Sequence, residues 1–383
     1  MQTKDRAQLR ILVAEDHFNM RRTIRNMLEK LGYQHIVTVV DGQAAWERLQ
    51  KEKFDLIICD WNMPKMEGID LLRTLRQTEK FRDMPFLMVT GVVAEERIAE
   101  AAEIDADAYI IKPFVTKILE EKIDVILKNH ANPDQVEIHL RNGEDHLRKE
   151  EYEEALKEFE KALALRPENA RSHCFLGESH EKLGNHERAQ EAYSEAIRLG
   201  PLYIRAYQRL ADLCERQGLT GRVKELLQKA NEISPRNLER KLRLGKMYLE
   251  SGESDAAEDI FSDALTMAPE DQEIRREIGE AFLRHGMEDA AADTFKEILD
   301  MNPQDIPAHD RLGIAYHKKG KYKLAIEQYK KAIKIAPKNE HLHYNMGRAL
   351  LKAGSTKDAK DALERAVQLN PKFTEAQETL ANL

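Results

Sequence analysis

The sequence predicts a multidomain protein in which an α/β doubly wound sheet is followed by an all-α solenoid of stacked helix pairs. In residues 1–130, short runs of valine, isoleucine and leucine alternate with amphipathic stretches. This alternation is typical of buried parallel strands that are joined by helices. From residue 136 onwards no such runs remain, and one pattern of small, large and proline residues recurs every 34 residues. A fixed period of this length indicates a repeat architecture.

Composition excludes several classes of function. The 383-residue chain has a net charge of −8, so it is a poor candidate for binding nucleic acid through phosphate contacts. It has no apolar run near the ~18 residues that span a membrane, and its N-terminus is too charged for a signal peptide. Its three cysteines lie far apart in the sequence, which favours a reducing compartment. We therefore expect a cytoplasmic protein with no nucleic-acid or membrane partner.

Five apolar runs in the first part of the chain are predicted strands. They cover Leu9–Ala14, Ile36–Val40, Phe54–Cys59, Pro85–Val89 and Ala108–Ile111. Each run is short and almost continuously apolar, as expected for a strand that is buried on both faces. Helical patterns lie between the runs, for example over Met20–Leu31 and Gly42–Gln50.

Charged and hydroxyl side chains follow four of these runs. Glu15 and Asp16 follow the first run, Asp60 the third, Thr90 the fourth and Lys112 the fifth. Because doubly wound sheets bind ligands at the carboxyl ends of their strands, we expect these side chains to converge. Three crowded carboxylates repel one another unless a cation lies among them, and their hard oxygens suit Mg²⁺. A lysine and a hydroxyl can hold an anion nearby, so the sequence predicts a magnesium and phosphoryl site with Asp60 as nucleophile.

Prolines mark the period in the second part of the chain. They are Pro167, Pro201, Pro235, Pro269, Pro303, Pro337 and Pro371. Mostly small residues recur 24, 12 and 5 positions before each proline, and a large residue recurs 8 positions before it. Small residues let two helices approach closely, and the large residue fills the space between them. One helix pair cannot bury its own apolar face, so the seven copies must stack.

These patterns also place the domain borders. Asp134 and Glu137 predict a capping box that begins the first repeat helix, after a polar segment that contains Pro133. The expected parts are a sheet domain over 1–128, a linker over 129–135, seven repeats over 136–373 and a C-terminal capping helix over 374–383.

Both parts resemble known families. The first resembles the receiver domain of two-component response regulators over residues 8–127, and it is similar to the single-domain chemotaxis response regulator. The motifs that carry this resemblance are Glu15-Asp16, Asp60, Met63-Pro64, Gly68, Thr90 and Lys112-Pro113-Phe114. The 34-residue register resembles the tetratricopeptide repeat over residues 136–373. The resemblance implies a flavodoxin-like receiver with strand order 2-1-3-4-5, followed by a tetratricopeptide-repeat solenoid.

The receiver resemblance also implies a role for each site residue. A histidine kinase or phosphotransfer protein would phosphorylate Asp60. The implied Mg²⁺ ligands are Asp16, Asp60, the Asn62 carbonyl and, mostly through water, Glu15. Thr90 and Lys112 would contact the phosphoryl group, Tyr109 would be a switch aromatic, and the Lys112-Pro113 bond would be cis. Two residues depart from the pattern: Glu15 replaces the commoner aspartate, and Val92 replaces a usually polar residue that bears on phosphate lifetime.

Several alternative interpretations stay open. Glu15 and Asp16 could serve only as acidic residues at the start of a helix, and Tyr109 could be an ordinary core residue. His17 adjoins the acidic pair, but the family has no ligand there, so we expect it to be solvated. The other histidines lack zinc-site spacing with cysteine, and Cys174 and Cys214 are expected to be buried.

The concave face of the repeats has two interpretations. The positions of residues within the 34-residue repeat predict that the early part of this face is acidic and that its later part is mixed apolar and basic. Such a face would suit an extended peptide with a basic end. The residues are Glu144, Glu178, Glu181, Asp212, Glu215, Leu242, Lys246, Leu249, Arg276, Ile314, Tyr344 and Arg348. The alternative, which we favour, is that acidic and basic residues pair four positions apart along each helix. The pairs are Glu137–Arg141, Glu144–Arg148, Glu178–Lys182, Asp212–Arg216, Glu239–Arg243 and Glu280–Arg284.

The leading hypothesis is a Mg²⁺-dependent response regulator in which phosphorylation of Asp60 controls protein binding by the repeats. It is not expected to be an enzyme with an external substrate, because no second nucleophile or base is found. Two alternatives are a constitutive scaffold whose receiver is only a docking module, and a hydrolase of phosphorylated substrates. The kinase, the bound protein and the pathway are not specified by the sequence.

Overall fold

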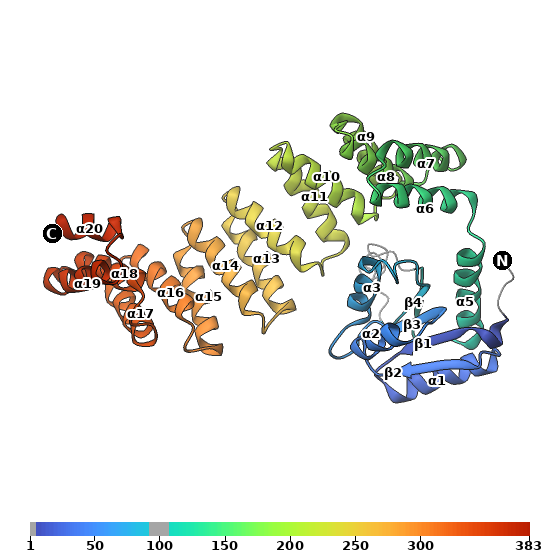
Figure 1. Cartoon of the computed structure of the whole chain (residues 1–383), viewed down its shortest axis with the longest axis horizontal. Helices are drawn as coiled ribbons and strands as arrows, with labels where there is room; N and C mark the ends of the chain where they lie inside the picture. The colour runs from blue at the N-terminus through green and yellow to red at the C-terminus, as the bar shows by residue number, and fades with distance from the viewer. Residues whose placement is uncertain (1–4, 92–106) are drawn as a thin grey trace. The chain divides into compact units, whose positions relative to one another are not determined.

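The computed structural model describes residues 5–91 and 107–383. The contacts within the chain divide it into two units, residues 1–236 and residues 237–383, and each unit is described by itself. The first unit contains the sheet domain and the first three repeats, and the second contains the remaining repeats (Figure 1).

The sheet domain has five parallel strands in the order β2-β1-β3-β4-β5. The strands are β1 (Arg10–Ala14), β2 (His35–Val39), β3 (Leu56–Asp60), β4 (Phe86–Thr90) and β5 (Ala108–Ile111). Their bounds differ from the predicted runs by at most two residues, which is the usual uncertainty at the end of an element. The predicted fold class and the implied strand order are therefore confirmed.

Helices cover both faces of this sheet, and the reason lies in the alternation of side chains along each strand. Leu12 and Ala14 of β1 belong to one apolar cluster, together with residues of α2 and α3. Ile11 and Val13 of the same strand belong to another, together with residues of α1 and α5. The helices are α1 (Phe18–Lys30), α2 (Gly42–Lys51), α3 (Gly68–Gln77) and α5 (Thr116–Ala131), and a 3₁₀ turn, η1 (Arg6–Gln8), precedes β1 (Figure 1). Because β1, β3 and β4 are buried on both sides apart from exposed Arg10, their sequences are apolar except at the ends of the strands.

The repeats fold as antiparallel helix pairs. In the first unit they are α6 (Gln135–Arg148), α7 (Tyr152–Leu165), α8 (Ala170–Lys182), α9 (His186–Leu199), α10 (Ile204–Arg216) and α11 (Thr220–Ile233). In the second unit they are α12 (Leu238–Glu250), α13 (Ser254–Met267), α14 (Gln272–Arg284), α15 (Glu288–Met301), α16 (Ile306–Lys318), α17 (Tyr322–Ile335), α18 (Glu340–Lys352) and α19 (Thr356–Leu369), followed by α20 (Thr374–Ala381). The expected C-terminal helix corresponds to α20. Within the described ranges, no helix has the length and apolar character needed to cross a bilayer.

After five of the seven prolines, the residue two positions later caps the next helix with its side chain, whereas Tyr203 and Phe373 do not. Two residues after Pro167, Asn169 caps the next helix by accepting the backbone N–H of Ser172 at 2.8 Å. Six residues after the same proline, His173 Nε2 lies 2.9 Å from the proline carbonyl oxygen. Proline therefore stops one helix, and the residues that follow it begin the next.

Glycine stands 24 positions before six of the seven prolines, with Ala211 in its place before Pro235, and it provides the close helix approach that the pattern predicts. A Cβ atom at Gly279 would lie 2.7, 3.0 and 3.1 Å from ring atoms of Phe295, which is fully buried. We expect Gly279→Ala to lower the free energy of unfolding by about 1–3 kcal/mol, the usual cost of overpacking a core. Urea unfolding of the full chain, followed by circular dichroism, measures this change.

Gly221 is the matched control for that substitution. It lies in α11, and nothing stands within 4 Å of a Cβ atom added there. Gly221→Ala should therefore raise stability by up to about 1 kcal/mol, because alanine favours the helix. Equal effects of the two substitutions would show that the Phe295 ring moves aside at no cost.

The junction between the two kinds of structure is shorter than the seven-residue linker predicted from the sequence. Helix α5 continues to Ala131 and α6 begins at Gln135, so three residues lie between them. Asp134 Oδ1 accepts the backbone N–H of Glu137 at 2.8 Å, as the predicted capping box requires. Its Oδ2 accepts Arg166 Nη2 at 3.0 Å. Glu137 Oε1 accepts Arg141 Nε at 3.0 Å and its Oε2 accepts Arg171 Nη1 at 3.3 Å, so arginines engage both oxygens of the residue that would complete the box.

Candidate functional site

The residues that follow the strands meet at one edge of the sheet. The parallel register sets Ala14 opposite Cys59, Asp60 opposite Val89 and Thr90 opposite Ile111. Glu15, Asp16 and Lys112 directly follow the ends of β1 and β5. The carboxyl ends of four strands therefore bring the predicted site residues to a common rim.

An ammonium group lies between two buried carboxylates at this rim. Lys112 Nζ is 2.7 Å from Glu15 Oε2 and 2.6 Å from Asp60 Oδ1. Glu15 is fully buried and Asp60 is 6% exposed. Because isolated buried charges are costly, the two carboxylates require this cation or another one in its place.

The electrostatics of the pocket follow from its burial. Burial raises the pKa of Glu15 above its usual value, although the Lys112 ammonium acts in the opposite direction, and the charge of Asp60 adds to the rise. Burial lowers the pKa of Lys112, but its hydrogen bonds to Asp60 and Glu15 outweigh this, so that pKa lies above its usual value. The pKa values of Glu15 and Lys112 therefore each depend on the charges of the other groups in the pocket.

Asp16 lies at the open side of the pocket, with its side chain 29% exposed. Its Oδ1 is 2.7 Å from His17 Nδ1, and the same nitrogen is 3.7 Å from Glu15 Oε1. The His17 side chain is 77% exposed, as expected, but it also contacts the acidic pair. Arg21 Nη1 donates to the backbone carbonyls of Glu15 at 2.6 Å and Asp16 at 3.0 Å, which fixes the backbone beside β1.

The loop after Asp60 is held by glycine and by an ion pair that sequence reasoning missed. Gly68 N–H donates to the Trp61 carbonyl at 2.9 Å, and a Cβ atom at Gly68 would overlap the Asp60 carbonyl oxygen. Lys65 Nζ donates to Asp41 Oδ2 at 2.8 Å. Asp41 is almost fully buried and caps α2 by accepting the Ala44 N–H at 2.7 Å. An aspartate followed by glycine at a helix start signals the cap, but nothing in the sequence signals its lysine partner.

The other predicted site residues have different surroundings. Asn62 is exposed, whereas Thr90 is buried and its carbonyl accepts the Lys112 N–H at 2.7 Å. Tyr109 is half-buried: its ring packs against the cluster under α2 and α3, and Lys122 Nζ lies 5.6 Å from the ring centroid. Tyr109 thus has a core contact, as the alternative interpretation requires, and a solvent-facing side. The Lys112–Pro113 bond is cis, as the resemblance implied, and Val92 lies outside the described residues.

The donor set of this rim fits a divalent cation. Glu15, Asp16 and His17 each offer one ligand atom, and the three atoms lie within 4.8 Å of one another. Asp60 adds a carboxylate that shares Lys112 with Glu15. Buried and partly exposed oxygens on an open rim are the donors that Mg²⁺ uses while it keeps several waters.

In the repeats of the first unit, one predicted pair within a helix forms, and other predicted carboxylates pair between repeats. Glu137–Arg141 forms at 3.0 Å as predicted. The groove carboxylates instead pair with arginines of the following repeat, at 2.6 to 3.2 Å: Glu144 with Arg171, Glu178 with Arg205 and Arg209, and Glu181 with Arg216. Arginine reaches the carboxylate one repeat away because the stacked helices set the two side by side. The early groove is therefore less acidic than its sequence suggests.

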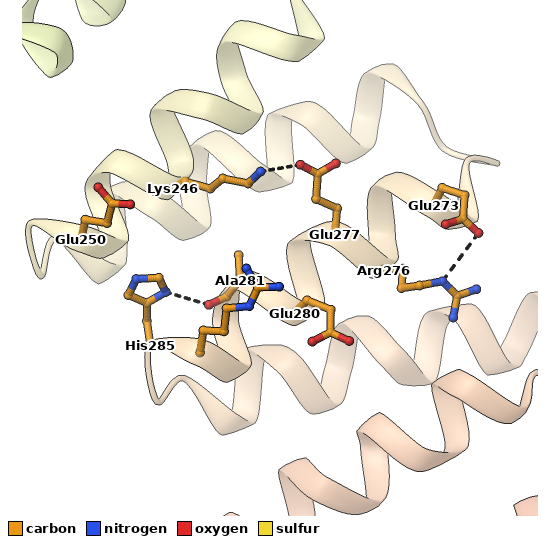
Figure 2. Close-up of a pocket in the computed structure, with 9 residues that line it drawn as sticks. Lys246, Glu250, Glu273, Arg276, Glu277, Glu280, Ala281 and His285 are labelled. Atoms are coloured by element: carbon orange, nitrogen blue, oxygen red, sulfur yellow. Dashed lines mark hydrogen bonds and ion pairs between the residues drawn. The ribbon is translucent and has the colours of Figure 1, made fainter. Parts of the chain in front are cut away.

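The second unit has a groove of about 420 Å³ between α12 and α14 (Figure 2). Its lining residues are Lys246, Glu250, Glu273, Arg276, Glu277, Glu280, Ala281, Arg284 and His285. Lys246 Nζ lies 2.5 Å from Glu277 Oε1, and Arg276 Nη2 lies 3.1 Å from Asp305 Oδ2. Glu280 pairs with Arg311 of the next repeat. Leu249, predicted to face the groove, is buried in the core instead. The groove is lined mainly by paired charges.

Comparison with known proteins matches both parts of the chain. Residues 11–124 match the response regulator receiver domain. Tetratricopeptide repeat descriptions match residues 140–204, 176–222, 242–306, 313–354 and 341–373.

Individual relatives cover the same two parts. The chain is 41% identical over 120 residues to the chemotaxis protein CheY-3 of Vibrio cholerae serotype O1, covering 31% of this chain and 92% of that protein. It is equally similar to the chemotaxis protein CheY of Pseudomonas aeruginosa, of which it covers 97%. A tetratricopeptide repeat protein of Parabacteroides merdae is 18% identical, with a TM-score of 0.39 over 64% of this chain and 98% of that structure. By the family matches and its identity to the two chemotaxis proteins, the chain belongs to the response regulator receiver family through its first domain, and its second part is built of tetratricopeptide repeats.

Proposed function

We propose that this protein is a two-component response regulator in which Mg²⁺-dependent phosphorylation of Asp60 changes what the repeats bind. One observation carries the proposal: Lys112 Nζ lies within 2.7 Å of both Glu15 and Asp60, beside the partly exposed Asp16. The pocket thus combines a carboxylate nucleophile, a cation that holds phosphoryl oxygens and donors for a divalent metal.

In the proposed reaction, a carboxylate oxygen of Asp60 attacks the phosphorus of a phosphohistidine on the partner. The phosphorus–nitrogen bond breaks, the imidazole leaves and an acyl phosphate forms on Asp60. Lys112 and the hydroxyl of Thr90 hold the phosphoryl oxygens. Glu15, Asp16, Asp60 and the Asn62 carbonyl would hold Mg²⁺, which supplies charge neutralisation when it is bound. Because the phosphoryl group stays on the protein, the reaction is a switch rather than turnover of an external substrate.

The switch requires a second conformation that the phosphoryl group favours. Lys112 would leave one of its two carboxylates to contact the phosphoryl group, and Thr90 would be drawn toward it. Tyr109, with its core contact and solvent-facing side, would then turn inward. Moving a two-state equilibrium from 1:99 to 99:1 takes about 5.5 kcal/mol of differential stabilisation. Charge-assisted hydrogen bonds to a phosphoryl dianion supply energies of this order.

The two parts of the chain assign two kinds of partner. A receiver domain takes its phosphoryl group from a kinase or phosphotransfer partner, and tetratricopeptide repeats bind proteins. We propose that a histidine kinase donates the phosphoryl group. The output is the binding of a protein or peptide segment in the repeat groove, and the protein acts in the cytoplasm. Neither a nucleic acid nor a membrane is a proposed partner.

The experiment is phosphorylation of the full chain by acetyl phosphate. With Mg²⁺ present, the intact mass should rise by one phosphoryl group, and hydroxylamine should remove it because acyl phosphates are labile to that nucleophile. Excess EDTA should suppress the reaction. No mass gain, or a gain that resists hydroxylamine or is indifferent to EDTA, would contradict the proposal. Phosphorylation without any change in partner binding would favour the constitutive scaffold.

A further inference from the structure

His17 supplies the pocket with a donor of a different chemical kind. It directly follows Asp16 and occupies the N-cap of α1. Its Nδ1 lies 2.7 Å from Asp16 Oδ1 and 3.7 Å from Glu15 Oε1. A nitrogen atom therefore stands beside the two carboxylates that begin the rim, where a metal would otherwise meet oxygen donors alone.

These separations lie near those between neighbouring ligands of one metal ion, although the shorter one is also a hydrogen-bond distance. Two ligands at right angles, each about 2.1 Å from an octahedral ion, lie about 3.0 Å apart. The distances of His17 Nδ1 to the two carboxylate oxygens, 2.7 and 3.7 Å, lie on either side of this value. With 77% of its side chain exposed, His17 can make the small adjustment that coordination needs.

Imidazole changes the preference of such a site. Carboxylate, carbonyl and water oxygens suit Mg²⁺, whereas imidazole suits later first-row metals such as Ni²⁺. We propose that His17 is a specificity-determining residue that binds a late first-row divalent ion together with Asp16 and Glu15. The inference rests on the proposed function, because it uses the same carboxylate pocket. In the competing explanation His17 only hydrogen-bonds Asp16 and does not affect ion selectivity.

The test compares Ni²⁺ and Mg²⁺ binding by the full chain through tryptophan emission. Trp61 directly follows Asp60 and is buried, so it reports on this pocket and not on the other twelve histidines of the chain. Trp46→Phe removes the only other tryptophan and serves as the background. The variants are His17→Ala and, as a matched control, His35→Ala. His35 is also exposed, but it lies at the opposite end of the sheet, at the start of β2.

We expect His17→Ala to weaken Ni²⁺ binding at least about tenfold, the usual loss when a group that supports a metal is removed. Its affinity for Mg²⁺ should stay within about twofold of the parent, which also shows that the pocket is folded, and His35→Ala should change neither ion. An unchanged ratio of the two affinities would overturn the role of His17 and leave the proposed function intact. Equal weakening of both ions would show that His17 acts only through Asp16. Failure of the parent to bind either ion would overturn the proposed function as well.

Discussion

Asp60→Asn should abolish phosphorylation of the full chain by acetyl phosphate and Mg²⁺. An asparagine has nearly the same size and shape but lacks the carboxylate that attacks phosphorus, so no acyl phosphate can form. The substitution also removes one of the two negative charges that contact Lys112, the nearer of which lies 2.6 Å from Nζ. Mg²⁺ binding should weaken for the same reason. Intact-mass measurement gives the extent of phosphorylation, and tryptophan emission in urea shows whether the domain remains folded.

Asp70→Asn is the control for a lost carboxylate. Asp70 lies in the first turn of α3, half exposed, and its carboxylate pairs with Arg73 at 2.6 Å rather than with Lys112. The control should be phosphorylated to the same extent as the parent. If Asp60→Asn gains a phosphoryl group as readily as the parent, the nucleophile is another residue. The assignment of the rim as a phosphoryl site would then fail, even though the fold would stand.

The sequence predicts the fold well because the relevant signals are local or strictly periodic. The runs that became β3 and β4 are buried on both faces, and their apolar character needs no partner to be recognised. The rim residues were equally predictable, since a parallel sheet gathers the carboxyl ends of its strands. The turn after Pro167 follows from helix capping, as Asn169 shows.

Ion pairs were predicted less well because their partners are distant in sequence. Glu178 has a lysine four positions later, which suggested a pair along one helix, but it accepts Arg205 and Arg209 of the next repeat. A rule based on spacing along one helix cannot anticipate which residues stacking brings together. Lys65 and Asp41 make the same point within the receiver, because 24 positions separate them.

Lys112→Met should destabilise the metal-free receiver by about 3–5 kcal/mol, the usual cost of removing one partner of a buried charge pair. Glu15, fully buried, and Asp60, 6% exposed, would face each other without a cation. Mg²⁺ should restore much of the loss, since an ion that binds only the folded state raises its stability. Urea unfolding in EDTA and in Mg²⁺, followed by tryptophan emission, measures both effects. Both tryptophans, Trp46 and Trp61, lie in this domain.

The same variant should acquire a characteristic dependence on pH. Burial already raises the pKa of Glu15 above its usual value of 4.5, and the loss of the Lys112 ammonium would raise it further. At pH values between 4.5 and that higher pKa, Glu15 binds more protons in the folded state than in the unfolded state. Stability therefore rises as the pH falls through the folded pKa, and more steeply in Lys112→Met than in the parent.

An exposed lysine that takes no part in the Glu15–Lys112–Asp60 ion pairs provides the control for this prediction. Lys117 is 81% exposed and pairs weakly with Glu121 at 3.9 Å, so Lys117→Met should change stability by no more than about 0.5 kcal/mol. If Lys112→Met in EDTA is as stable as this control and gains nothing from Mg²⁺, the two carboxylates do not need a cation. In that case the rim cannot depend on a metal when the phosphoryl group arrives. A loss that Mg²⁺ reverses would instead show that Lys112 and the metal neutralise the same buried charges, which is the physical requirement of the proposed switch.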